Sequence, residues 1–456
     1  MESFTSEINK ILVIGEIDDY HKSIKRHYSF TKGLGIATGF SKLAETFYLT
    51  KGKEEEYMGT KFINISNITD EFMDTIDFIL LIREHTVLQI LNIEPIRKVL
   101  FNKRKRQIVG MKSDALGWMW TKQYFIEFPK KYNEDWLTFV AYAFNFLCVQ
   151  TEEFKTQGLS LILRKRPNRF DDFKDKIFVS RMGVFPDYPL DETLENPYLI
   201  DHSYCVDDFT KLNAGKALHP LCYMDRNIKY SLDKGVNYRK EKTIIIYMGR
   251  IRTNSGKIVW MMRDIMKELG DEYELHVFPG RFNIPNSNVT VFSSKYPSNL
   301  QILRDTCFFE CKNIVVHFPF DDKNKKKYLQ FANIGLDFSS VRPNNRKCPA
   351  GNAKLLEYCN YGLKVITEKN VNNSHLVKSA KCGILLKGVS QVEDYVNGIK
   401  KLKEMNIDKE YAIKITIDEQ NWDIISSEMF FYVSNLRKLV LSGSENIMAS
   451  LINNPE

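Results

Sequence analysis

One stretch of the sequence, residues 349–367, constrains the fold more than any other. Pro349 and Gly351 form a turn, an apolar periodic segment follows, and Gly362 ends that segment after about three helical turns. The run 363–367 comes directly afterwards and predicts a strand. A loop, a helix and a strand in this order are typical of an α/β domain. The free backbone N–H groups at the start of the helix carry the positive end of its dipole, so they can receive a phosphate.

The second half of the chain repeats this kind of unit. The apolar run 243–250 predicts a buried strand, and apolar residues at helical spacing follow it over 258–269. Further strands are predicted at 274–278, 288–292 and 313–318. From residue 389 to about residue 440 the pattern is helical. Strands that alternate with helices predict a parallel sheet covered by helices.

The first half begins with a predicted buried strand at 10–15. The glycine-rich segment 31–40 follows, and we expect it to form a loop that leads into a helix from Leu43. Its glycines serve either a bound ligand or only the turns of the chain. The other strands predicted in this half lie at 61–65, 78–82, 107–111, 146–153 and 176–184.

Polar residues directly follow two of these predicted strands. The carboxyl ends of strands in doubly wound sheets line the crevice where ligands bind, so Glu84, His85 and Asp114 are candidates for acid–base chemistry. Lys112 would help to keep Asp114 ionised. Helix caps and surface charges are the alternative interpretation. Trp118 follows closely and is a candidate for stacking on a sugar or a base, with core packing as its alternative.

Composition limits the class of protein. A chain of 456 residues predicts two or three domains. No run approaches the roughly 20 apolar residues of a membrane span, and the N-terminus lacks the pattern of a signal peptide, so we expect a cytoplasmic protein. The eight cysteines lack metal-ligand spacing and predict free thiols without a metal site. The net charge of +8 suits a nucleotide-sugar, a nucleic acid or an anionic membrane. We expect the basic runs 103–106, 164–166 and 323–327 to be solvated surface.

The segment 351–358, Gly-Asn-Ala-Lys-Leu-Leu-Glu-Tyr, followed by 362–367, resembles the donor-sugar motif of GT-B glycosyltransferases. In that family a G-(N/T)-K-L-x-E-Y helix runs into G-x-P-V-I. Other segments resemble the family's motifs in the family's order; they are 249–257, 332–340, 382–386 and the terminal helix from 420. The resemblance is continuous over about 240–390 and looser over 8–184.

The resemblance implies an α/β protein with a GT-B-like fold, in which two doubly wound, Rossmann-type domains face a central cleft. In that family the turn and the helix N-terminus hold the nucleotide diphosphate and the sugar, and the Glu accepts hydrogen bonds from the ribose. An Arg and a Lys of the donor loop neutralise the leaving diphosphate. These donor roles fall on Gly249, Arg250, Lys257, Gly351, Asn352, Lys354 and Glu357, while Gly33, Gly35 and Trp118 would contact the acceptor substrate.

Two positions depart from the family's pattern. Gly256 precedes Lys257, whereas in the family the glycine follows the lysine. Many retaining members place a first Glu eight positions before the ribose Glu, and here Pro349 occupies that position. The sequence therefore leaves inversion or retention of the anomeric configuration open.

We therefore expect four parts in the chain. These are an acceptor-side domain at 1–184, an interdomain segment or insertion at 185–241, a nucleotide-sugar domain at 242–410 and C-terminal helices at 411–456 that cross back to the first domain. The expected reaction transfers a sugar, most simply a hexose, from a UDP- or GDP-sugar to a hydroxyl acceptor such as a glycan or a lipid, without an obligatory metal or other cofactor. The alternatives are a phage-type DNA glucosyltransferase acting on a modified base and a non-catalytic binding protein with the same fold.

Overall fold

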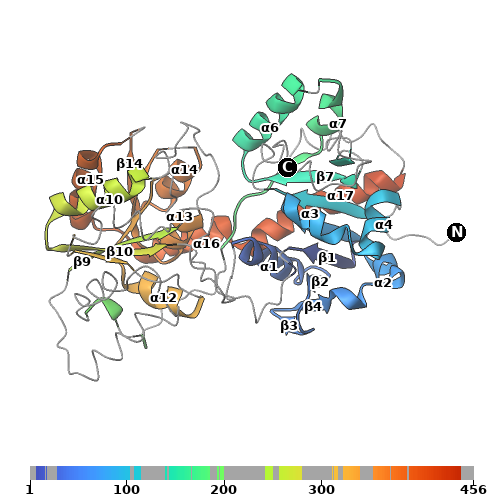
Figure 1. Cartoon of the computed structure of the whole chain (residues 1–456), viewed down its shortest axis with the longest axis horizontal. Coiled ribbons are helices and arrows are strands. Elements are labelled where there is room, and N and C mark those ends of the chain that lie inside the picture. Colours follow the sequence, from blue (N-terminus) through green and yellow to red (C-terminus); the bar gives the residue numbers. More distant parts are fainter. Residues whose placement is uncertain are drawn as a thin grey trace, which may run out of the picture. The chain divides into compact units, whose positions relative to one another are not determined.

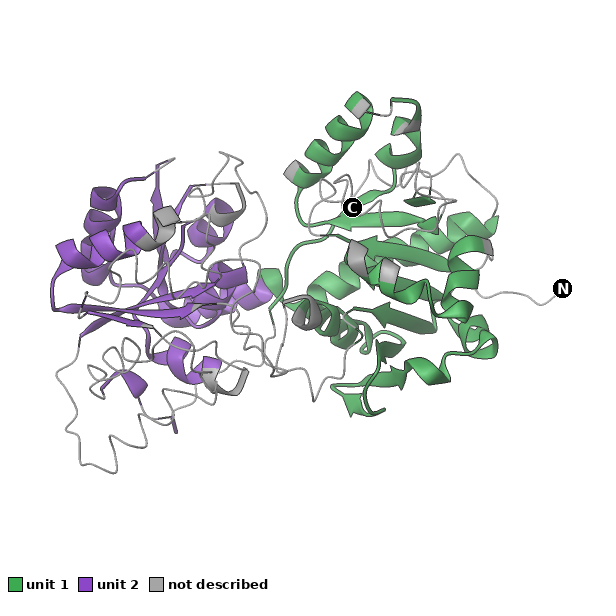
Figure 2. Ribbon diagram, in the orientation of Figure 1, with its two compact units in different colours: residues 1–185, 349–351, 419–456 green, residues 186–348, 352–418 purple. Residues whose placement is uncertain are grey.

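The computed structural model describes residues 7–15, 17, 28–102, 107–113, 139–140, 143–165, 167–184, 193–194, 196–199, 242–249, 256–279, 311, 313–316, 322–338, 353–369, 371–387 and 390–442. The chain divides into two compact units (Figure 2). Unit 1 contains residues 1–185, 349–351 and 419–456, and unit 2 contains residues 186–348 and 352–418. Each unit is built around one sheet with helices packed on it (Figure 1).

The sheet of unit 1 has eight strands in the order β3-β4-β2-β1-β5-β6-β7-β8. Its strands are β1 (Lys10–Ile14), β2 (Glu45–Thr50), β3 (Glu56–Tyr57), β4 (Thr60–Asn64), β5 (Phe78–Ile82), β6 (Ile108–Lys112), β7 (Phe146–Val149) and β8 (Ile177–Val179). All neighbours are parallel except β3 and β4. The chain starts in the middle at β1 and winds outward in both directions, which is the doubly wound arrangement predicted from the sequence.

The helices of unit 1 are α1 (Tyr28–Phe40), α2 (Asp70–Thr75), α3 (Glu84–Ile90), α4 (Glu94–Asn102), α6 (Glu152–Lys165), α7 (Phe170–Lys174) and α17 (Trp422–Ser442). The expectation of a glycine-rich loop at 31–40 followed by a helix from Leu43 is wrong. The glycines lie inside α1, and the segment after Leu43 forms strand β2. Close packing explains the glycines, because a Cβ on Gly35 would overlap the Trp422 indole and a Cβ on Gly39 would overlap Ser426.

Helix α17 joins the C-terminal part of the chain to the first strands of unit 1. Trp422, at its first turn, is buried against Gly35 and Gly183. Ser426 Oγ donates a hydrogen bond of 3.0 Å to the Ile36 carbonyl oxygen of α1. These contacts make α17 part of the core of unit 1, although unit 2 lies between the two segments in the sequence.

An ion pair fixes the other end of α17. Arg437 Nη1 lies 2.8 Å from Asp77 Oδ1, and both side chains are largely buried. Asp77 Oδ2 accepts hydrogen bonds from the backbone N–H groups of Asn9, at 2.8 Å, and Lys10, at 3.0 Å. One carboxylate therefore links α17 to the start of β1 and to the segment before β5.

The sheet of unit 2 has six strands in the order β11-β10-β9-β12-β13-β14, and all neighbours are parallel. Its strands are β9 (Thr243–Gly249), β10 (Tyr273–Pro279), β11 (Ile314–Val316), β12 (Ile334–Leu336), β13 (Lys364–Glu368) and β14 (Gly383–Leu386). Its helices are α10 (Gly256–Leu269), α12 (Asp322–Phe331), α13 (Ala353–Asn360), α14 (Val371–Ser379), α15 (Val392–Glu404) and most of α16 (Lys409–Gln420). The strand predicted at 288–292 lies outside the described residues.

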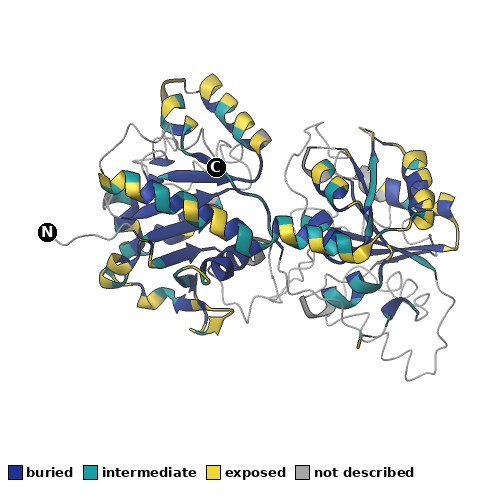
Figure 3. Cartoon of the chain, turned by 180° about the vertical axis from the view of Figure 1, so that it is seen from behind, coloured by how far each residue is buried: buried dark blue, intermediate teal, exposed yellow. Residues whose placement is uncertain are grey.

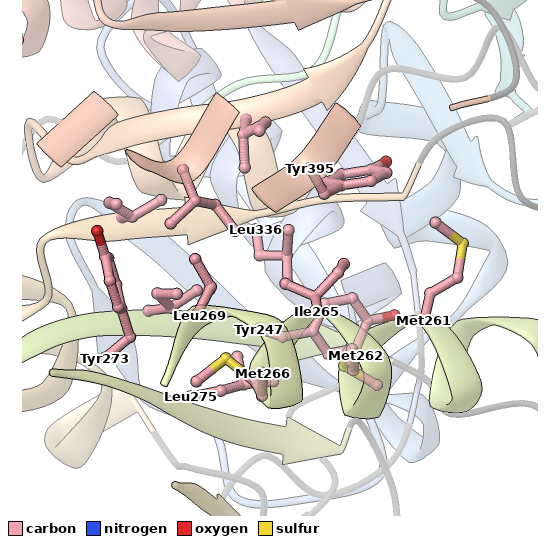
Figure 4. Close-up of a cluster of buried hydrophobic side chains, with 14 of the residues drawn as sticks. Tyr247, Met261, Met262, Ile265, Met266, Leu269, Tyr273, Leu275, Leu336 and Tyr395 are labelled. Carbon is pink, nitrogen blue, oxygen red and sulfur yellow. The ribbon is translucent and has the colours of Figure 1, made fainter. Parts of the chain in front are cut away.

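A hydrophobic core holds α10 and α15 against one face of this sheet (Figure 4). Met262 and Ile265 of α10 and Tyr395 of α15 contribute to it together with Leu275 and Leu336 of the strands. The strands are largely buried and the exposed residues lie mainly on the helices (Figure 3). Among the described helices, none is both long enough and apolar enough to cross a membrane.

Candidate functional site

The strand order of unit 2 reverses at its first strand, β9. From β9 the chain builds β10 and β11 on one side and β12, β13 and β14 on the other. In open parallel sheets, ligands bind outside the carboxyl ends of the strands at such a switch point. The residues that end β9 and β12, and the helix α13 that follows them, therefore form the candidate site.

Gly249 ends β9 and has a φ of +141°, a backbone conformation that residues other than glycine rarely adopt. A Cβ at this position would lie 3.3 Å from Lys354 Cδ of α13. The lysine stem thus passes directly over the end of β9. The structure brings together two residues, Gly249 and Lys354, that the sequence assigned to the donor site.

Asp337 connects the ends of two strands to α13. Its Oδ1 lies 2.7 Å from Lys354 Nζ, and its Oδ2 accepts a hydrogen bond of 2.8 Å from Thr367 Oγ1 of β13. Lys354 Nζ also lies 4.8 Å from the centre of the Tyr247 ring. The Asp337 side chain is only 1% exposed, so this carboxylate is a buried group with two strong partners. Sequence reasoning missed Asp337 and Thr367, although Thr367 ends the predicted strand 363–367 and Asp337 lies in the segment 332–340.

Tyr358 fixes the position of α13 on the sheet. It is fully buried, its hydroxyl accepts a hydrogen bond of 2.9 Å from the Met248 N–H, and it lies 3.3 Å from the Ile246 carbonyl oxygen. Burial raises the pKa of Tyr358 well above its usual value, so the hydroxyl stays protonated. Gly335 of β12 leaves the space that the tyrosine ring occupies. These contacts hold the first turns of α13 beside the end of β9.

Glu357 forms the second ion pair of the site. Its Oε1 lies 2.9 Å from Lys325 Nζ of α12, and the two side chains are 22% and 10% exposed. Its Oε2 is buried and forms no hydrogen bond with the part of the chain that the structure describes. A buried carboxylate oxygen without a partner is costly, so a hydrogen-bond donor from outside the described residues would stabilise this atom.

Lys325 is buried, although we expected the run 323–327 to be solvated surface. Lys325, Tyr328 and Leu329 lie three and four positions apart, so they share one face of α12, and all three are buried. That face packs toward the sheet, where the Tyr328 and Phe278 ring centres are 4.9 Å apart. The helix period therefore turns Lys325 inward.

The carboxyl edge of the sheet in unit 1 holds the other predicted cluster. The Arg83 N–H, directly after β5, donates a hydrogen bond of 2.8 Å to the carbonyl oxygen of Lys112 at the end of β6. Arg83 has a φ of +76°, an unusual value for a residue other than glycine. The two polar segments predicted to lie at one edge of a sheet are thus neighbours there.

Lys112 reaches across this edge. Its Nζ donates hydrogen bonds to the Ser180 carbonyl oxygen at 2.7 Å, to Ser180 Oγ at 2.6 Å and to the Arg181 carbonyl oxygen at 3.2 Å. These bonds join the end of β6 to the segment after β8. They give Lys112 a structural role that the sequence did not indicate.

The structure describes the remaining predicted site residues to different extents. Glu84 and His85 begin α3, but their side chains are not among those described, and the same holds for Lys257 in α10. Arg250, Gly351, Asn352, Asp114 and Trp118 lie outside the described residues. Gly33 and Gly35 lie in α1, where the nearest side chains are Tyr48 and Trp422. Within the described ranges, no group of three or more His, Cys, Asp or Glu side chains could hold a metal ion.

Comparisons with known proteins give matches of structure only. No protein-family model matches the sequence, and no curated protein matches it. A glycosyltransferase from Rickettsia africae is similar in structure with a TM-score of 0.56 and 11% identity, over 96% of this chain and 100% of that one. Anabaena Alr3699/HepE in complex with UDP has a TM-score of 0.53 and 10% identity, over 93% of this chain and 100% of the other.

The E. coli trehalose-6-phosphate protein bound with UDP-2-fluoro glucose is also similar. Its TM-score is 0.52 and its identity is 11%, over 94% of this chain and 99% of that protein. These similarities extend over both units, and they agree with the doubly wound sheet in each. The chain therefore has the GT-B fold of glycosyltransferases.

Proposed function

We propose that the protein is a glycosyltransferase that moves a hexosyl group from a nucleoside diphosphate sugar, with UDP as the first candidate nucleotide, to a hydroxyl acceptor. The observation that carries this proposal is the group at the switch point of unit 2. There Gly249, the Lys354–Asp337 pair and Glu357 surround the start of α13. UDP and UDP-2-fluoro glucose in two of the similar structures support a uridine nucleotide.

The residues of the site suit the parts of such a donor. The first turn of an α-helix has backbone N–H groups without intrahelical acceptors and a positive dipole end, so the start of α13 is suited to a diphosphate. Gly249, which has no side chain, leaves room for the Lys354 stem, so the positive charge of Lys354 lies near the end of β9, where it would attract the phosphates. Glu357 offers Oε2 to the ribose hydroxyls. In this proposal Arg250 and Lys257 would stabilise the charge that develops on the leaving diphosphate.

We assign the acceptor to unit 1 and the base to one of its side chains. Asp114, Glu84 and His85 remain the candidates, because the segments that carry them follow neighbouring parallel strands. The base would take the proton of the acceptor hydroxyl as its oxygen attacks the anomeric carbon. No described residue adds an observation that favours the DNA-modifying or the non-catalytic alternative.

Binding of UDP should stabilise the protein. At about 100 times its dissociation constant, UDP should raise the stability of the unit that binds it by about 2.7 kcal/mol, because it binds only the folded state. Thermal unfolding with UDP, GDP and their glucose conjugates measures this shift, and uridine without phosphates is the control. Unchanged unfolding with all four compounds would contradict a donor site in unit 2.

The Glu357→Ala variant should bind UDP more weakly. Each charge-assisted hydrogen bond from a ribose hydroxyl contributes roughly 1.5 to 3 kcal/mol, so the dissociation constant should rise at least tenfold while the fold is kept. Isothermal titration of the folded variant measures the change. The matched control is Glu268→Ala, because Glu268 is exposed on α10, on the opposite face of the sheet. Equal UDP affinity in parent and Glu357→Ala would remove Glu357 from the site.

A further inference from the structure

The donor site of the proposed function leaves one buried charge without a role. Lys325 lies on α12, more than 20 residues before the motif that carries Glu357, and its side chain is 10% exposed. Its ammonium contacts the carboxylate oxygen of Glu357 at 2.9 Å. A lysine in a run of five basic and polar residues is ordinarily exposed, so its burial here calls for a partner.

We propose that Lys325 is a positioning residue for ribose recognition and that, together with Glu357, it makes the site selective for ribonucleotides. This inference rests on the proposed donor site. Lys325 holds Oε1 of Glu357, and Oε2 is left for the hydroxyls of the ribose. The two residues come from different helices, so the carboxylate has a fixed direction before any ligand binds.

The physical argument concerns the freedom of the glutamate side chain. A glutamate has several rotatable bonds, and fixing them on binding weakens the affinity by roughly two- to twelvefold. An ion pair that is mostly shielded from water fixes the carboxylate in the free protein and moves that cost from binding to folding. Solvent and salt screen such a pair less than a surface pair. Lys325 should therefore strengthen the ribose contact without touching the base or the phosphates.

A purely structural tie between α12 and α13 would behave differently. It would lower the affinity for every nucleotide by the same factor, whether or not the nucleotide carries ribose hydroxyls. A positioning role lowers the affinity only where a hydroxyl meets Glu357. The ratio of two dissociation constants in one variant separates these cases, even where the variant is less stable than the parent.

The experiment titrates UDP and 2′,3′-dideoxy-UDP into the full chain. The parent should bind UDP at least tenfold more tightly than the dideoxy compound. Lys325→Met should weaken UDP binding by about tenfold and leave the dideoxy compound nearly unchanged, so the preference falls by about tenfold. Lys325→Arg, which keeps the charge and the hydrogen bond to Oε1, should restore at least part of the preference. The control Lys327→Met, at a half-buried position of the same helix, should bind both compounds as the parent does.

The possible results distinguish a failure of the Lys325 role from a failure of the proposed function. Equal losses for both compounds in Lys325→Met, or no loss at all, would overturn the role of Lys325 while Glu357→Ala still weakens UDP binding. A parent that binds neither UDP nor GDP would overturn the proposed function, and the inference with it. Should GDP be the nucleotide that binds, GDP and its dideoxy analogue take the place of the uridine pair.

Discussion

Replacing Trp422 with alanine should lower the free energy of unfolding of unit 1 by about 3 to 5 kcal/mol. The indole is only 2% exposed, and it fills the space that Gly35 and Gly183 leave open. Its removal creates a cavity between α1, α17 and the segment after β8, and glycines have no side chains that could fill it. The change removes both the buried apolar surface and the packing contacts around it.

Urea denaturation followed by circular dichroism measures this loss. The two units can unfold in separate transitions, so each transition is fitted by itself. The matched control is Phe431→Ala, because Phe431 lies on the same helix and is 68% exposed; it should change the stability by less than about 0.5 kcal/mol. Similar losses in the two variants would show that the Trp422 packing is not what holds α17.

Asp114→Asn should lower the rate of sugar transfer by a factor of about 100 to 10,000, since removal of a general base typically has this effect. The residue follows β6, next to Ser113, whose N–H donates a hydrogen bond of 2.8 Å to the Cys148 carbonyl oxygen. That bond extends the pairing of β6 and β7 to the carboxyl edge of the sheet. An amide at position 114 cannot accept the acceptor's proton, although it has nearly the same shape.

Steady-state kinetics with UDP-glucose, together with titration of UDP, test this assignment. The affinity for UDP should stay as in the parent, because the proposed donor site consists of residues of unit 2. Glu84→Gln and His85→Asn are the comparison variants, since both residues start α3 after the neighbouring strand. If Asp114→Asn retains turnover within a few-fold of the parent, Asp114 is not the base. The base is then Glu84 or His85, whichever replacement abolishes transfer, or none of the three residues if neither does.

The buried strands were predictable because parallel strands in a covered sheet are apolar on both faces. The run 78–82 is strand β5 at the predicted bounds, and the run 243–250 contains β9. The predicted helix and strand within 349–367 are α13 and β13, because the helical period and the apolar run after it are local patterns; Gly362 has a left-handed conformation after the helix end, as its glycine predicts. In these cases a local pattern is sufficient.

The segment 31–48 was not predictable in this way. Glycines favour loops by their intrinsic preference, but those in α1 are required by the side chains packed against them. Trp422, which packs against Gly35, lies about 390 residues further along the chain, so no local pattern around residues 31–40 can predict this contact. The apolar residues of β2 are close together and fit either a helical or an extended period.

The candidate site shows the same limit. Glu357 and Lys354 were predicted because they belong to one helix and one motif. Their partners Lys325 and Asp337 come from α12 and from the end of β12, and only the sheet topology brings them to α13. A sequence shows which groups end predicted strands, but it does not show which charges pair.

The packing of α17 on α1 also affects the order in which the chain can fold during synthesis. Ser426 and Ile36, which share a hydrogen bond, are separated by 390 positions. At a ribosome speed of roughly 5 to 20 residues per second, about 20 to 80 seconds pass between the synthesis of these two residues. During that interval Gly35 and Gly39 of α1 lack the α17 side chains that pack against them. Nearly all of unit 2 has been made before α17 appears. The unit that is started first is therefore completed last, and a nascent chain stalled before Trp422 should depend on chaperones to protect its N-terminal part.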